Sequence, residues 1–154
     1  MSQITRRAFA ALLFLTAGVF AAGQNRIIYS DTANAHADIA QAIHTATRER
    51  KRIILDFGGN WCGDCQVLDI YFHQPPNEAI VEKNFVVVHV DIGRMDKNVD
   101  VADKYEVPLK RGVPALAVLD PHGRLLYSQK DGEFESMRHM DPASVTEFLN
   151  HWKQ

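Results

Sequence analysis

Two cysteines, Cys62 and Cys65, are the residues whose spacing points most directly to chemistry. They stand in the motif Trp61-Cys62-Gly63-Asp64-Cys65, just after an apolar run and at the start of a predicted helix. Two cysteines separated by two residues can alternate between a dithiol and a disulfide. The free amides and the dipole of a helix N-terminus favour a negative charge there. We therefore expect Cys62 to be the exposed, more acidic thiol that attacks a substrate, and Cys65 to resolve the mixed disulfide.

The same motif leaves other interpretations open. The two cysteines could form an inert local disulfide or remain two buried thiols. They could also be half of a zinc site, but a closed zinc site needs four ligands and the sequence has no second cysteine pair. The histidines that could complete such a site, at spacings not typical of zinc, are His73, His89 and His122.

The composition is that of a soluble globular protein. The chain has 154 residues, of which 46% are hydrophobic and 23% charged. This balance suits one domain and excludes a disordered chain, a collagen-like repeat and a polytopic membrane protein. With 17 Lys and Arg against 19 acidic residues, the chain has no strong basic field that would favour a nucleic-acid partner.

Residues 1–23 have the pattern of a secretory signal peptide. Arg6 and Arg7 precede an uncharged stretch, residues 8–22, that ends in small residues. The arginine pair also resembles a twin-arginine export signal, and the alternatives are an uncleaved membrane anchor or a buried helix. Without residues 1–23, the domain 24–154 has 15 basic and 19 acidic residues, a net charge of −4. We expect a periplasmic or otherwise exported protein, in a compartment where disulfide chemistry operates.

Strands and helices alternate along residues 24–154. Apolar periodicity and turn residues predict helices over 34–50, from 62 to the prolines at 75–76, 76–83, 98–105 and 141–152. The predicted strands are 26–29, 52–57, 85–90, 114–119 and 124–128. We expect Asn98 and Asp141 to cap the helices that follow them, and the last two strands to form a hairpin. This order predicts an α/β fold, a sheet with helices on both faces.

The pattern of these residues resembles the thioredoxin family. The segments that carry the resemblance are Ile54-Leu55-Asp56-Phe57, the cysteine motif and Gly112-Val113-Pro114. The break at Pro75-Pro76-Asn77-Glu78 is similar to bacterial periplasmic members of the disulfide-bond (Dsb) type. The resemblance covers residues 26–153 and implies a thioredoxin fold, with a central mixed β-sheet flanked by helices. It also implies a thiol–disulfide oxidoreductase that acts on protein thiols and disulfides through its own redox-active disulfide, without a cofactor.

The resemblance assigns roles to single residues. Asp56 matches the buried acid that takes the proton of the second cysteine. Pro114 matches a cis-proline facing the active site, and Val113 before it would offer its backbone to an extended substrate. Trp61 would form an apolar rim against which the substrate rests.

The chain departs from the family pattern at several positions, and the helix after Cys65 lacks the proline that usually kinks it. Gly58 replaces a bulky aromatic residue, Asp64 replaces a proline, and His89 stands where a lysine is common. Gly63 and Asp64 then become the residues that tune the redox potential. A negative Asp64 near the Cys62 thiolate would disfavour that thiolate and make the disulfide less oxidising. We therefore expect a reductase or isomerase that a membrane electron donor recharges.

A metal-binding function is the alternative. The long segment from Gln129 to Met140 contains Met137, His139 and Met140, residue types that can bind copper. A non-enzymatic metal-binding or metallochaperone module on the same fold would use the two cysteines and a histidine. We expect the enzyme, as a monomer, without a bound metal and without a nucleic-acid partner.

Overall fold

The computed structural model describes residues 26–154, so the predicted signal peptide lies outside the described residues. The helices are α1 (Ala35–Glu49), α2 (Gly63–Phe72), α3 (Asn77–Asn84), α4 (Val99–Lys104) and α5 (Ala143–Trp152). The strands are β1 (Arg52–Gly58), β2 (Phe85–Asp91), β3 (Ala115–Leu119) and β4 (Leu125–Ser128). Two short 3₁₀ helices, η1 (Leu109–Arg111) and η2 (Met137–His139), precede β3 and α5. Over this described range, every helix is too short or too polar to cross a membrane.

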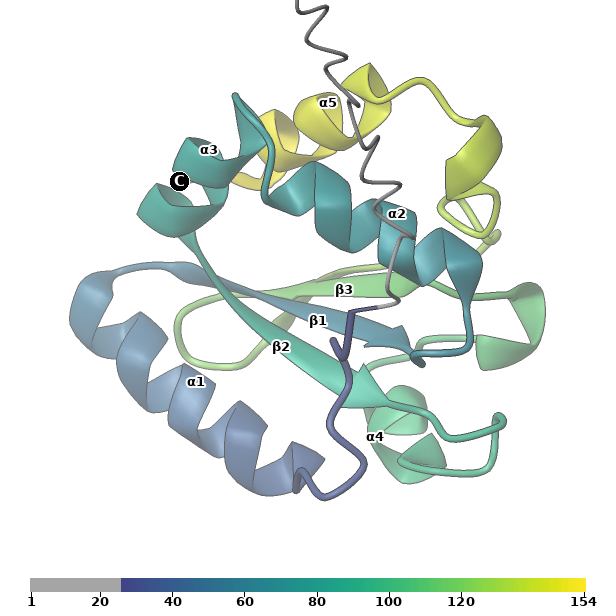
Figure 1. Ribbon diagram of the computed structural model, residues 1–154. Coiled ribbons are helices and arrows are strands. Elements are labelled where there is room, and N and C mark those ends of the chain that lie inside the picture. Colours follow the sequence, from purple (N-terminus) through teal and green to yellow (C-terminus); the bar gives the residue numbers. More distant parts are fainter. Residues whose placement is uncertain (1–25) are drawn as a thin grey trace, which may run out of the picture.

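The four strands form one mixed sheet in the order β2-β1-β3-β4 (Figure 1). Strand β1 pairs in parallel with β2 and antiparallel with β3, and β3 and β4 form the predicted hairpin. The register places Asp56 of β1 opposite His89 of β2. Two residues that are far apart in sequence are thereby brought side by side on neighbouring strands.

Helices cover both faces of the sheet, as the sequence predicts. Figure 1 shows α2, α3 and α5 on one face and α1 and α4 on the other. Because side chains alternate along a strand, Ile53, Leu55 and Phe57 of β1 pack into the core beneath α1, and Ile54 packs into the core beneath α2 and α5. The same alternation places Asp56 on the α2 face.

Local sequence explains where α1 begins and ends. The side chain of Asn34 accepts a hydrogen bond from the amide of Ala37, which caps the helix. Ile39, Ala42 and Ala46 form the buried face that their spacing predicts. The helix ends at Arg50, which adopts the left-handed conformation.

The strand predicted for residues 26–29 is wrong. Within the part of the chain that the structure describes, this segment pairs with no strand, and the amides of Ile28 and Tyr29 donate instead to Oδ1 of Asn60, at 2.8 and 3.1 Å. The side-chain amide of Asn60 in turn donates to the carbonyl of Tyr29. One asparagine side chain therefore satisfies backbone groups that a neighbouring strand would otherwise have satisfied.

One predicted helix cap is wrong, and the start of another helix differs by one residue. Asn98 precedes α4 as expected, but its side chain donates to the carbonyl of Asp91 and does not cap the helix. Helix α5 begins at Ala143, one residue later than the start predicted at Pro142. The carboxylate of Asp141 still accepts a hydrogen bond from the amide of Ala143, the capping contact that the sequence predicts.

Candidate active site

The two cysteines form a disulfide at the N-terminal end of α2. Cys62 is the N-cap residue of this helix, and its sulfur accepts a 3.1 Å hydrogen bond from the amide of Cys65. Cys62 is 6% exposed, whereas Cys65 is fully buried. Cys62 is thus the more accessible cysteine, as expected, but the expectation of an exposed residue is wrong, because neighbouring loops cover most of it in the disulfide form.

The loop before β3 lies against Cys62. The carbonyl oxygen of Val113 is 3.5 Å from the Cys62 sulfur, and the Val113–Pro114 peptide bond is cis, as the family resemblance implies. The side chain of Gln129, which is buried, accepts from the amide of Leu116 and donates to the carbonyl of Pro114. Gln129 therefore holds the loop at Pro114 in place through these two hydrogen bonds, a role that its sequence position does not indicate.

Asp56 lies in β1 with an exposed fraction of only 1%. Its Oδ2 accepts a 2.8 Å hydrogen bond from the Tyr29 hydroxyl and lies 2.9 Å from Nδ1 of His89. Its Oδ1 has no hydrogen-bond partner among the described residues. The expected buried acid is therefore held by two side chains from outside its own strand.

His89 connects this buried carboxylate to the surface. Its side chain is 27% exposed and lines two grooves, of about 500 and 350 Å³. Burial lowers the pKa of His89, but the hydrogen bond and charge of Asp56 outweigh this effect, so its pKa is raised above the ordinary value. His89 is thus placed to exchange a proton with solvent on one side and with Asp56 on the other.

Tyr29 fills the space that Gly58 leaves open. A Cβ built on Gly58 would collide with the Tyr29 hydroxyl, and it would lie 2.8 Å from the sulfur of Cys65. The Tyr29 hydroxyl, which binds Asp56, and the buried cysteine sulfur therefore meet at this glycine. Burial, and then the charge of Asp56, raise the pKa of Tyr29 well above its ordinary value, so the hydroxyl keeps its proton.

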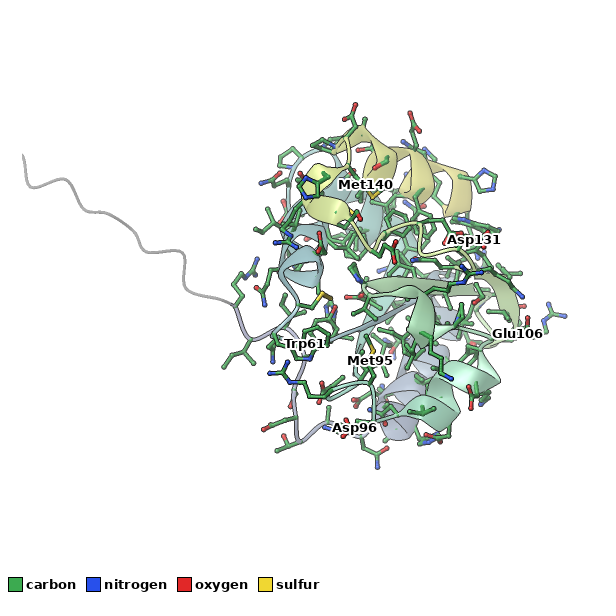
Figure 2. The ribbon with its side chains drawn as sticks, turned by 90° about the vertical axis from the view of Figure 1, so that its right-hand side faces the viewer. Trp61, Met95, Asp96, Glu106, Asp131 and Met140 are labelled. Carbon is green, nitrogen blue, oxygen red and sulfur yellow. A yellow bond between two sulfur atoms is a disulfide. The ribbon has the colours of Figure 1, made fainter. Side chains whose placement is uncertain are left out.

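Trp61 lies next to Cys62, and the guanidinium of Arg94 is 5.3 Å from the centroid of its ring. Its ring is 44% exposed, and its Nε1 donates to the carbonyl of Gly93. Figure 2 shows Trp61 and Met95 on the same side of the molecule. Met95 lines a groove of about 530 Å³ that extends to Gly112, the residue before Val113. This arrangement suits the rim expected of Trp61.

Asp64 has a partner that the sequence does not reveal. Its carboxylate accepts hydrogen bonds from the backbone amide, Nε and Nη2 of Arg138, at 2.9, 3.2 and 3.0 Å. Burial raises the pKa of Asp64, but these hydrogen bonds outweigh it, so its pKa is lowered and the pair is ionic. Asp64 is therefore a negative charge that faces a cation, Arg138, which the sequence argument does not take into account.

The residues suggested for copper differ in their exposure, and Met140 is half-buried. Met137 is fully buried in the core, whereas His139 is exposed. Among residues 26–154, no three His, Cys, Asp or Glu side chains gather where they could hold a metal ion. Met137 therefore serves to anchor its segment to the core.

Four residues of the site escape sequence reasoning: Tyr29, Asn60, Gln129 and Arg138. Each acts through a contact with a residue distant in sequence, such as the 74 positions that separate Arg138 from Asp64. The one available signal is Gly58, because a missing side chain at a position usually filled by an aromatic residue implies that another group fills the space.

Comparisons with known proteins agree with this geometry. The family model described as thioredoxin-like matches residues 34–121. Thioredoxin-2 of Dictyostelium discoideum is 29% identical over 77 residues, which are 46% of this chain and 84% of that protein. A disulphide isomerase from Xylella fastidiosa Temecula1 is 31% identical, with a TM-score of 0.77 over 82% of this chain and 96% of that one. A thioredoxin from Thermus thermophilus shares the fold, with a TM-score of 0.54 and 19% identity over 73% of this chain and 81% of that one.

Proposed function

This chain belongs to the thioredoxin-like family and is a thiol–disulfide oxidoreductase, and we propose that it is exported and that it reduces or isomerises disulfides in protein substrates. The observation that carries the exchange chemistry is the Cys62–Cys65 disulfide at the start of α2, with the Val113 carbonyl beside it. A helix N-terminus stabilises a thiolate, and the loop at Val113 offers backbone groups to an extended peptide.

In the first step, the Cys62 thiolate attacks one sulfur of a substrate disulfide. The substrate S–S bond breaks, a Cys62–substrate disulfide forms, and one substrate thiolate leaves. The amide of Cys65, which lies 3.1 Å from the Cys62 sulfur in the disulfide form, is placed to stabilise the attacking thiolate. In an isomerase, a second substrate thiol then attacks this mixed disulfide and regenerates Cys62.

In a reductase, Cys65 resolves the mixed disulfide instead. Its thiol loses a proton and attacks the Cys62 sulfur, so that the protein disulfide forms and the second substrate thiolate leaves. Two electrons have then passed from the protein to the substrate. We assign the proton to Asp56, which His89 connects to the surface grooves.

Similarity to the disulphide isomerase supports the proposed direction of exchange. The charge of Asp64 does not decide the direction of exchange, because Arg138 compensates that charge. A protein that reduces or isomerises disulfides must itself be kept reduced. In an oxidising compartment this requires an electron donor, which we place in the membrane.

Export rests on the pattern of residues 1–23. We expect the mature protein to begin near residues 22–24 and to fractionate with the periplasm or its membrane. N-terminal sequencing of the fractionated protein tests this, and full-length protein in the cytosol would refute it.

The direction of exchange is tested with ribonuclease as substrate. The reduced protein should speed the recovery of activity from ribonuclease with scrambled disulfides, in a glutathione buffer. If it speeds only the oxidation of fully reduced ribonuclease, the protein is an oxidase and the proposed direction is wrong.

A further inference from the structure

The segment between β4 and α5 brings a cation to the cysteine motif. It carries η2, whose first residue, Met137, is fully buried in the core with Leu68 of α2. Successive side chains of a 3₁₀ helix point about 120° apart, so burial of Met137 turns Arg138 out of the core. Figure 2 shows the end of this segment at Met140. Arg138 then lies against the first turn of α2, where it binds Asp64.

Arg138 lies against both residues that separate the cysteines. Its backbone amide and two guanidinium nitrogens donate to Asp64, whose side chain is only 13% exposed. A Cβ built on Gly63 would lie 3.6 Å from Cζ, Nε and Nη1 of Arg138, so the guanidinium plane also flanks Gly63. A fork of donors on one carboxylate fixes geometry as well as charge. The cation is therefore held in a defined position against Gly63 and Asp64, the two residues that separate the cysteines.

The position of Arg138 affects the stability of the reduced state, in which Cys62 is a thiolate. An unpaired Asp64 at the start of α2 would repel that thiolate and offset the stabilisation that the helix dipole gives it. Arg138 cancels this repulsion. A more stable thiolate makes the reduced form more stable and the disulfide more oxidising.

We propose that Arg138 is a positioning residue that sets the reduction potential of the Cys62–Cys65 pair by neutralising Asp64 beside Cys62. The segment between β4 and α5 is then part of the redox site, because it carries the positive charge of Arg138 that sets the reduction potential. This inference rests on thiol–disulfide exchange at Cys62–Cys65 and is independent of export and of the direction of exchange.

The test is a double-mutant cycle on the reduction potential, measured by equilibration with glutathione and quantified by thiol alkylation. Arg138→Gln should shift the equilibrium towards the protein disulfide by about threefold to tenfold, where tenfold corresponds to about 30 mV. Asp64→Asn should shift it in the opposite direction. The double variant should return close to the wild-type value, and Arg138→Lys should recover part of the loss.

Arg124→Gln is the matched control. It removes an arginine whose Nε also binds an aspartate, Asp120, at 2.6 Å. That pair follows β3, and β3 runs antiparallel to β1, so it lies at the opposite end of the sheet from the cysteines. Arg124→Gln should leave the reduction potential unchanged.

A second readout separates charge tuning from support of the loop. Ultraviolet absorbance of the thiolate, followed against pH in the reduced protein, should appear at higher pH in Arg138→Gln than in the wild type. Added salt should shrink this difference. Lower resistance to urea with an unchanged thiolate titration would show a structural role only and overturn the proposal.

Two results of the cycle would also overturn it. One is an unchanged potential in Arg138→Gln, and the other is a double variant that keeps the full shift of Arg138→Gln, so that Asp64→Asn does not restore the wild-type value. Either result would mean that Arg138 does not act through Asp64. The potential can be measured whether or not the protein reshuffles ribonuclease disulfides. Failure of the proposed direction and failure of this inference are therefore distinguishable.

Discussion

The hydroxyl of Tyr29 donates a 2.8 Å hydrogen bond to Oδ2 of Asp56, from a segment that precedes the first helix. The same hydroxyl lies against the space above Gly58 that the sulfur of Cys65 also borders. Tyr29 therefore binds the buried acid and borders the same space as the buried cysteine. This places a residue of the N-terminal segment inside the proton-transfer part of the site.

Replacing Tyr29 tests that connection. Tyr29→Phe should lower the free energy of unfolding by about 1.5–3 kcal/mol, because a buried carboxylate loses a hydrogen bond. Urea unfolding of the oxidised protein measures this. Tyr127→Phe is the control, since it removes an exposed hydrogen bond to Glu133 and should cost about 0.5 kcal/mol or less. An equal loss of unfolding free energy in both variants would mean that the hydrogen bond from Tyr29 to Asp56 stabilises the fold no more than an exposed one.

Asp56→Asn should slow resolution by Cys65 more than attack by Cys62. Asparagine keeps the size of the side chain but cannot accept the proton, and general-base catalysis contributes about 10²–10⁴ in rate. Stopped-flow measurements with a fluorescent disulfide separate the two steps. In base, where His89 is neutral, we also expect higher stability, since a buried carboxylate oxygen without a partner is costly. Equal slowing of both steps would point to a packing role.

His89→Gln should change how stability depends on pH. Burial lowers the pKa of His89 but Asp56 outweighs it, so its pKa in the folded protein lies above the ordinary 6.5. The group therefore stabilises the fold fully below about pH 6.5, and this contribution is lost as the pH rises through the folded pKa. Urea unfolding from acidic to alkaline pH should show wild type and variant diverging in acid and converging in base.

The control for this pH profile is His36→Gln. His36 pairs with Asp100 at the surface, where both side chains are more than half exposed and solvent screens the pair. This variant should follow the wild-type profile closely. A constant difference between wild type and His89→Gln at every pH would contradict the assigned charge interaction.

The two cysteines should behave differently when each is replaced. Cys62→Ser should abolish exchange, because it removes the attacking thiolate. Cys65→Ala should accumulate mixed disulfides with substrates, since no internal thiol resolves them. Non-reducing gel electrophoresis measures the adducts. Faster alkylation of Cys65 than of Cys62 at neutral pH would reverse the assigned roles.

Local sequence predicts most of the fold. Helix α1 follows from Asn34 and an apolar face, and the β3–β4 hairpin follows from the turn between two apolar runs. The N-terminal strand could not be excluded in this way, because Arg26 to Tyr29 has the composition of a strand. Its backbone partner is a side chain, Asn60, and no local pattern records such a contact.

The residues of the site also fall into those that local sequence indicates and those that depend on distant contacts. The cysteines, Asp56 and Pro114 lie in short motifs, so their residue types and neighbours indicate their positions. The charge state around Asp64 depends on Arg138, which reaches it only because Met137 is buried in the core. Electrostatic arguments from neighbours in sequence therefore fail where a distant loop supplies the opposite charge.

The most direct test of the central claim, that Cys62 and Cys65 exchange disulfides with protein substrates, is the reduction of insulin by dithiothreitol. The wild-type protein should speed the precipitation of insulin well above the uncatalysed rate, and Cys62→Ser should return it to that rate. Titration of the reduced wild-type protein with zinc and copper(I) accompanies the assay. A wild-type rate equal to the uncatalysed one, together with tight metal binding that needs both cysteines, would contradict the account and favour a metal-binding protein.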